Sequence, residues 1–321
     1  MSLQFIFGNS GSGKSHYLYQ QIVEESIRHP EKNYLVLVPE QFTMQTQKDL
    51  CMAHPRGGIM NIDVLSFGRL APRVLEETGK ERQPILDDEG KNLVLRKIAG
   101  NYEDELTVLK GNLKKQGYIS EVKSVISEFT QYGIDFEQLD SFMEGLNSES
   151  YLYYKLKDIR KVYEGFEDYL HDKYITKEEL LDVLSQNVAE AKMLKDSVIA
   201  MDGFTGFTPV QNKLLRELLK LAQQVWVTVT LEEKVSVAQL KRPQHLFRMS
   251  GEMMESLTRM AAEERVEVLD PWWVRPGENS RFCKAPALEF LEQHLFRYDK
   301  RQYRKEQEEI RRFSYFFRIL A

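Results

Sequence analysis

The chain has 321 residues and a formal net charge of -5, so its length suits one large domain with an insertion, or two domains. Apolar residues make up 42% of it, enough for a real core, and no apolar run approaches the length of a membrane span. The mild acidity confines any nucleic-acid-binding surface to a local patch. Two distant cysteines, Cys51 and Cys283, exclude a disulfide framework and favour the reducing cytoplasm.

The first predicted elements are a strand, a glycine-rich loop and a helix. The apolar run Leu3–Phe7 predicts a buried strand, and apolar positions at helical spacing predict a helix over His16–Ile27. Between them, Gly8–Ser15 fits the pattern G-x-x-x-x-G-K-[ST] at every fixed position. Because the pattern lies between a strand and a helix, it predicts a phosphate-binding loop (P-loop). The alternative is a glycine turn that binds nothing.

The composition of this loop predicts how it would hold ATP and Mg²⁺. Its glycines allow the backbone to wrap closely around an anion at the positive end of the following helix. Lys14 is expected at the β- and γ-phosphates, and the Ser15 hydroxyl is expected to ligate Mg²⁺. The predicted ATP-binding residues of the loop are Gly8, Asn9, Ser10, Gly11, Ser12, Gly13, Lys14 and Ser15.

The next segments alternate between strands and helices. Asn33–Val38 and Ile59–Leu65 are predicted strands. A helix is expected to begin near Pro39–Thr43 and to run to about Met52, and another is expected from Ser66 to about Gly79. This alternation predicts the α/β class, a parallel sheet of the P-loop NTPase kind with helices on both faces.

The pattern changes between about Pro84 and Ala191, where strand-like runs disappear and amphipathic helical periods replace them. Thr176 and Glu179 predict a capping box at the start of one helix. Five aromatic residues are expected to pack in a core or interface rather than stack on bases: Phe129, Tyr132, Tyr151, Tyr153 and Tyr154. We therefore predict a first half of the P-loop domain (1–84), a helical insertion (85–191), and a second half with a charged helical tail (192–321).

The α/β rhythm returns at Ser197. Val198–Met201 is a predicted strand that ends in Asp202-Gly203, and Val225–Leu231 is another. Between them, Thr208 is expected to cap a helix that ends near Leu221. The remaining predictions are a helix over Ser256–Glu264, an edge strand over Val266–Leu269, a loop over Asp270–Pro286 and a charged helix over Leu288–Arg312.

Two residues of this second half are candidates for the nucleotide site. Asp202, at the end of a strand, is expected to hold Mg²⁺ through water, although Asp-Gly could simply make a turn. Gln211 could sense the γ-phosphate or could serve only as the capping-box residue of its helix. Gly203 stands where a carboxylate that orients the attacking water would commonly follow the aspartate. Loss of such a group typically costs about 10²- to 10⁴-fold in rate, so the sequence predicts nucleotide binding with weak or no turnover and no catalytic residue.

Four segments together resemble the N-terminal region of the AddB family, the B subunits of bacterial ATP-dependent helicase/deoxyribonucleases. They are GNSGSGKS (Gly8–Ser15), VPEQFT (Val38–Thr43), VLSFGRLA (Val64–Ala71) and MDGFTGFTPVQ (Met201–Gln211). They are similar to degenerate superfamily 1 helicase motifs. The order of these segments, with a helical insertion between VLSFGRLA and MDGFTGFTPVQ, implies a RecA-like domain.

The resemblance implies a non-motor subunit of a heterodimer with the helicase-nuclease protein AddA. Such a complex processes double-strand DNA ends for recombinational repair, and its B subunit helps to recognise Chi in single-stranded DNA. Family members are several times longer and carry a nuclease domain with four cysteines that bind a [4Fe–4S] cluster. Neither is expected here, because Cys51 and Cys283 match none of those cysteines. The terminal segment Tyr315–Ala321 suggests a truncated or frameshifted gene product.

Two alternatives from other classes stay open. One is a P-loop kinase or ATPase that acts on a small molecule beneath a helical lid. The insertion shows no basic or acidic substrate-binding set that would favour it. The other is a catalytically silent scaffold whose P-loop is only structural.

Overall fold

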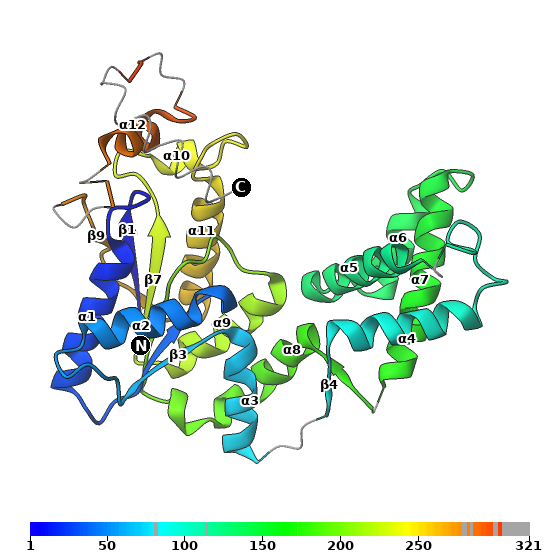
Figure 1. Cartoon of the computed structure of the whole chain (residues 1–321), viewed down its shortest axis with the longest axis horizontal. Coiled ribbons are helices and arrows are strands. Elements are labelled where there is room, and N and C mark those ends of the chain that lie inside the picture. The colour runs from blue at the N-terminus through cyan, green and yellow to red at the C-terminus, as the bar shows by residue number, and fades with distance from the viewer. Residues whose placement is uncertain are drawn as a thin grey trace. The chain divides into compact units, whose positions relative to one another are not determined.

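The computed structural model describes residues 1–79, 83–112, 115–171, 173–277, 281–282, 285–297 and 301–303 (Figure 1). The chain divides into two compact units. Unit 1 consists of Met1–Ser66, Lys195–Gly206 and Leu219–Ala321, and unit 2 consists of Phe67–Leu194 and Phe207–Leu218. These boundaries differ from the predicted segments, because the helix that follows the third strand groups with the helical unit. The predicted α/β class is confirmed.

Unit 1 is built on a sheet in which every strand pairing is parallel. Its strands are β1 (Ser2–Gly8), β2 (Tyr34–Leu37), β3 (Ile62–Leu65), β6 (Val198–Met201), β7 (Gln224–Thr230), β8 (Glu267–Val268) and β9 (Trp272–Trp273). They lie in the order β3-β2-β6-β7-β1-β8, with β9 also paired to β1. β2 and β6 are buried along their whole length, as expected of parallel strands that read as continuous apolar runs.

The helices of unit 1 follow the predicted alternation, but some of their bounds differ from the predicted ones. They are α1 (Lys14–Arg28), η1 (Glu40–Phe42), α2 (Thr43–Ala53), α10 (Val237–Leu240), α11 (Arg248–Glu263) and α12 (Pro286–His294). Leu18 and Ile22 of α1 pack with Ile6 of β1 in one buried cluster. α1 begins at Lys14, earlier than the predicted His16, because the loop closes directly into the first helical turn. α11 begins at Arg248 rather than the predicted Ser256.

The segment after α11 corrects two predictions. Asp270–Pro286 is not entirely loop, because Trp272 and Trp273 form β9 beside β1. The Trp273 ring packs edge-on against Phe7 at 5.0 Å between centroids, so this contact of the half-buried indole favours the strand. The predicted helix over Leu288–Arg312 ends at His294 in α12. Residues 298–300 and 304–321, including Tyr315–Ala321, lie outside the described residues.

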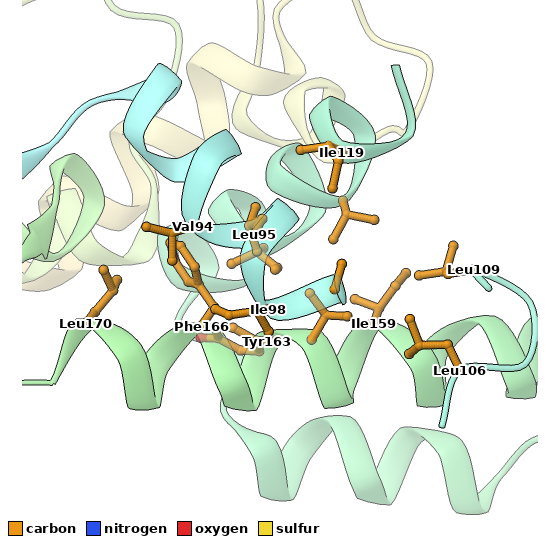
Figure 2. Packing of buried hydrophobic residues seen from close by; sticks show 14 residues of the cluster. Val94, Leu95, Ile98, Leu106, Leu109, Ile119, Ile159, Tyr163, Phe166 and Leu170 are labelled. Atoms are coloured by element: carbon orange, nitrogen blue, oxygen red, sulfur yellow. The ribbon is translucent and has the colours of Figure 1, made fainter. Parts of the chain in front are cut away.

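Unit 2 is mostly helical. Its elements are α3 (Phe67–Thr78), β4 (Ile85–Leu86), α4 (Asp88–Asn101), α5 (Gln116–Tyr132), α6 (Phe136–Glu144), α7 (Tyr151–Leu170), β5 (Ile175–Thr176), α8 (Lys177–Asn187), η2 (Val188–Glu190), η3 (Lys192–Leu194) and α9 (Pro209–Leu221), of which residues from Leu219 on belong to unit 1. Figure 2 shows Tyr163 and Phe166 of α7 pointing toward Leu95 and Ile98 of α4 in a large buried cluster. None of the described helices is both long and apolar enough to cross a membrane.

The insertion differs from its prediction at two short strands. β4 and β5 pair in parallel, with Ile85 opposite Ile175, so strand structure does not disappear from this region. Two-residue strands are too short to leave an alternating pattern in the sequence. The predicted capping box is confirmed. The Glu179 N–H donates to Thr176 Oγ1 (3.2 Å), and the Thr176 N–H donates to Glu179 Oε2 (2.6 Å).

The aromatic residues of the insertion differ in how exposed their rings are. Phe129 packs against Tyr163 with 6.0 Å between ring centroids, as the packing prediction requires. Tyr132 is 58% exposed and Tyr151 is 71% exposed, so neither packs in the core, and packing of these two in an interface stays a prediction. Both lie at helix ends, where a tyrosine can keep its ring partly in water because its hydroxyl is polar.

A partly buried carboxyl on α7, that of Glu167, gives unit 2 a pH-dependent stability. Burial, together with the charges of Glu179 and Asp168, raises the pKa of Glu167 from 4.5 to about 7. The folded state therefore holds the Glu167 proton more tightly than the unfolded chain does. The stability that this bound proton contributes is lost as the pH rises through 7. Glu167→Gln should raise the thermal midpoint at pH 8 by a few degrees, at about 2–4 °C per kcal/mol, with the gain vanishing near pH 5.

The measurement is thermal unfolding followed between pH 5 and pH 8. Glu128→Gln, at an exposed position on α5, is the control and should leave the pH profile unchanged. A midpoint for Glu167→Gln that tracks the parent protein at every pH would contradict the prediction.

Candidate nucleotide-binding site

The predicted loop lies between β1 and α1 and adopts a backbone that requires glycine. Gly11 has a φ of 72° and Gly13 a φ of 98°, both in the left-handed region that other residues rarely adopt. Gly8 is constrained by space, because an added Cβ would lie 2.5 Å from both Ser12 Oγ and the Val274 carbonyl oxygen. The three glycines therefore allow the chain to turn sharply from the strand into the helix.

Lys14 is the first residue of α1, and its ammonium group folds back onto the loop. Nζ donates to the carbonyl oxygens of Gly8 (2.9 Å) and Asn9 (2.8 Å). Burial lowers the pKa of Lys14 to about 8, against the opposing charge of Asp202. The Lys14 ammonium thus bonds to two neutral carbonyl oxygens. Negatively charged phosphate oxygens could take their place as stronger acceptors.

Two further features of the loop fit an anion. Ser12 Oγ is buried and has no hydrogen-bond partner, so the loop carries an unused donor. Gly13, which caps α1 without a side-chain hydrogen bond, has no heavy atom within 4 Å of the place where a Cβ would stand. The first turn of α1 therefore keeps open space next to backbone N–H groups that the helix itself does not use.

Asp202 comes directly after β6 and lies beside the start of α1, as predicted. Its carboxylate is 6% exposed and accepts a hydrogen bond from Ser15 Oγ at 3.0 Å on Oδ1. Thr228 Oγ1, on β7, donates to the same oxygen at 2.6 Å. The structure therefore brings together the two residues predicted as Mg²⁺ ligands, Ser15 and Asp202.

Tyr19 completes the environment of Asp202 and was not predicted. Its hydroxyl donates to Asp202 Oδ2 at 2.8 Å and lies 3.1 Å from Thr46 Oγ1 on α2. Because its single hydrogen goes to Asp202, Thr46 is the donor in the second bond. Burial, followed by the Asp202 charge, raises the pKa of Tyr19, so its hydroxyl stays a donor. Tyr19 lies one helical turn after Ser15, the only sequence signal that could have indicated it.

Gly203 follows Asp202 and has a φ of 79°, a left-handed conformation. A Cβ there would lie 3.6 Å from Pro39 Cδ and 3.7 Å from Phe42 Cδ2, so space alone would admit a side chain. The backbone conformation is what favours glycine here over a water-orienting carboxylate.

Gln211 has a structural task within unit 2. Its Oε1 accepts a hydrogen bond from the Thr208 N–H at 2.9 Å, and its own N–H donates to Thr208 Oγ1 at 3.3 Å. This is the predicted capping arrangement at the start of α9. A γ-phosphate contact by Gln211 stays a prediction.

No group of three or more His, Cys, Asp or Glu side chains in the described part of the chain is placed to hold a metal ion. A Mg²⁺ ion in this loop would therefore depend on Ser15, on Asp202 through water, and on phosphate oxygens, which suit its preference for oxygen ligands and retained waters. Cys51 is a free thiol, and Cys283 lies outside the described residues.

A parallel sheet with a glycine loop after β1, and an aspartate at the end of β6 bonded to the loop serine, defines the RecA-like α/β class. A family model described as "ADDB, N-terminal" matches residues 5–292. The chain belongs to this family.

Named relatives agree with the family model. One of them, the B subunit of the ATP-dependent helicase/deoxyribonuclease of Lachnoclostridium phytofermentans, is 44% identical over 314 residues, covering 97% of this chain and 27% of the relative. Proteins of the same name from Ruminiclostridium cellulolyticum and a Thermoanaerobacter species are 30% and 32% identical, each over 98% of this chain and 27% of the relative. The chain thus spans about a quarter of the length of these relatives.

Proposed function

We propose that this chain is the ATP-binding part of the B protein of a helicase/deoxyribonuclease. The observation that carries the proposal is the pairing of Ser15 with Asp202 at 3.0 Å, next to a lysine held by the carbonyls of its own glycine loop. In this proposal Lys14 and the loop N–H groups bind the triphosphate. Ser15 and Asp202 hold Mg²⁺, which when bound neutralises phosphate charge.

Turnover of the bound nucleotide is expected to be slow. Gly203 occupies the position after Asp202 and cannot orient or polarise a water molecule. The Asp202 carboxylate is itself occupied by three hydroxyl donors, from Ser15, Tyr19 and Thr228. We therefore propose that the protein binds ATP tightly, hydrolyses it slowly or not at all, and is not the motor subunit.

The relatives' name supports a role in the processing of DNA ends. We infer that the full-length protein pairs with the helicase-nuclease protein AddA and engages double-strand ends and single-stranded DNA for recombinational repair, including recognition of Chi. The chemistry of DNA cleavage and a [4Fe–4S] cluster would belong to parts of the relatives that this chain does not span.

The test is assembly of this chain with AddA on a blunt-ended DNA duplex. The chain is expected to co-elute with AddA and to increase the affinity of AddA for the DNA end. The sample without AddA and a duplex closed by hairpins at both ends are the controls. Failure to co-elute with AddA, or equal binding to open and closed duplexes, would contradict the proposal.

A further inference from the structure

The glycine loop is covered by two residues from the far end of the chain, Arg281 and Phe282. The Arg281 N–H donates to the Gly11 carbonyl at 3.2 Å. A Cβ on Gly11 would lie 2.6 Å from Phe282 Cε2 and 2.8 Å from Cζ, so the ring rests directly on this glycine. Gly11, the middle of the loop, is thus held at its carbonyl and at its Cα by one dipeptide.

The chain that leads to this dipeptide is anchored to the same part of the sheet. β9 pairs with the end of β1, and the Val274 N–H donates to the Phe7 carbonyl at 2.8 Å. Arg275 then makes a bidentate ion pair with Glu233, at 2.7 Å and 3.1 Å. These contacts hold the segment from Trp272 to Arg275 beside the end of β1.

We propose that Arg281 and Phe282 form a strap that holds the glycine loop in its present conformation, and that binding of a nucleoside triphosphate separates this strap from Gly11. The inference rests on the proposed function. For Lys14 to reach phosphates it must leave the carbonyls of Gly8 and Asn9, and the loop must wrap around the anion. Gly11 cannot take part in that change while Phe282 rests on it. The strap therefore lowers the apparent affinity by reducing the fraction of binding-competent loop.

The first test compares dissociation constants for a fluorescent ATP analogue with Mg²⁺. Phe282→Ala removes the ring and is expected to bind the analogue about three- to tenfold more tightly than the parent chain. Leu295→Ala, which shortens an exposed apolar side chain just after α12, is the control and should bind as the parent does. Unchanged or weaker binding by Phe282→Ala would overturn the strap.

The second test needs no variant. Hydrogen exchange of the Arg281 amide, resolved by fragmentation mass spectrometry, should accelerate when Mg²⁺ and a non-hydrolysable ATP analogue are added. An Arg281 amide that exchanges at the same rate, or more slowly, at saturating analogue would overturn the strap.

The two proposals fail in different ways. If the parent chain binds the analogue, and Lys14→Ala does not, but Phe282→Ala gains no affinity, only the strap is wrong. If neither the parent nor Phe282→Ala binds the analogue, both the nucleotide site and the strap are contradicted. Binding by Phe282→Ala alone would support a strap that closes the site fully.

Discussion

Replacement of Lys14 by alanine should weaken the binding of Mg·ATP by about 10- to 100-fold. Nζ is the cation that the loop directs inward, and a hydrogen bond from a charged group is worth about 1.5–3 kcal/mol. That range corresponds to roughly one to two powers of ten in the dissociation constant. Within the described part of the chain, the Lys14 ammonium donates only to the loop carbonyls of Gly8 and Asn9, so its loss should leave the sheet of unit 1 in place.

The measurement is a titration with a fluorescent ATP analogue, with circular dichroism to confirm that the variant is folded. Lys48→Ala, on the exposed part of α2, provides the matched loss of one lysine charge and should change the dissociation constant less than about twofold. Retention of near-parental affinity by Lys14→Ala would mean that the loop does not bind phosphate through its lysine.

The second large effect is expected in unit 2, at Asp158 of α7. This carboxylate is 3% exposed and accepts hydrogen bonds from the backbone N–H groups of Thr107, Val108 and Leu109, at 2.6–3.0 Å. It ties the segment after α4 to the long helix. Asp158→Ala leaves these three donors without their acceptor, at about 1–3 kcal/mol for each one that stays buried.

The expected loss is therefore about 3–5 kcal/mol in the free energy of unfolding, measured by urea denaturation of the whole chain. Asp168→Ala, at an exposed position on the same helix, is the control and should cost within about 0.5 kcal/mol. A loss for Asp158→Ala no larger than that of the control would show that water replaces the carboxylate at these N–H groups.

The sequence predicts those parts of the site that depend on neighbouring residues. The glycine loop, its strand and its helix lie within a single run, so the pattern and its context are visible together. The Ser15–Asp202 pair could also be expected, because the carboxyl ends of parallel strands meet at one edge of the sheet. The register of β6 against β7 then explains why Thr228, next to Val227, reaches the same carboxylate.

Other parts of the site depend on contacts between distant segments, which leave no local pattern. Tyr19 and Asp202 are 183 positions apart, and nothing in α1 indicates that its tyrosine would donate to that carboxylate. β9 returns the chain to β1, and Phe282, further along the chain, contacts Gly11. Pro271 comes directly before Trp272 and Trp273, and a proline there favours the prediction of a loop, so the sequence does not indicate β9.

The boundary between the two compact units could not be predicted from the sequence, for a similar reason. Amphipathic periodicity shows that α3 has a buried face but does not show which neighbour covers it. In the structure α3 groups with α8, and the chain passes from unit 1 to unit 2 at Phe67 rather than near residue 84. Helix packing between sequence-distant partners decides such boundaries.

The central claim is that this chain binds a nucleoside triphosphate firmly and hardly cleaves it. The direct measurement is retention and turnover of radiolabelled Mg·ATP by one preparation of the purified chain. We expect one retained ATP per chain, dependent on Lys14, and a turnover far below about 1 s⁻¹, the low end of typical enzyme rates. No retained ATP, or turnover at the speed of a DNA motor, would contradict it.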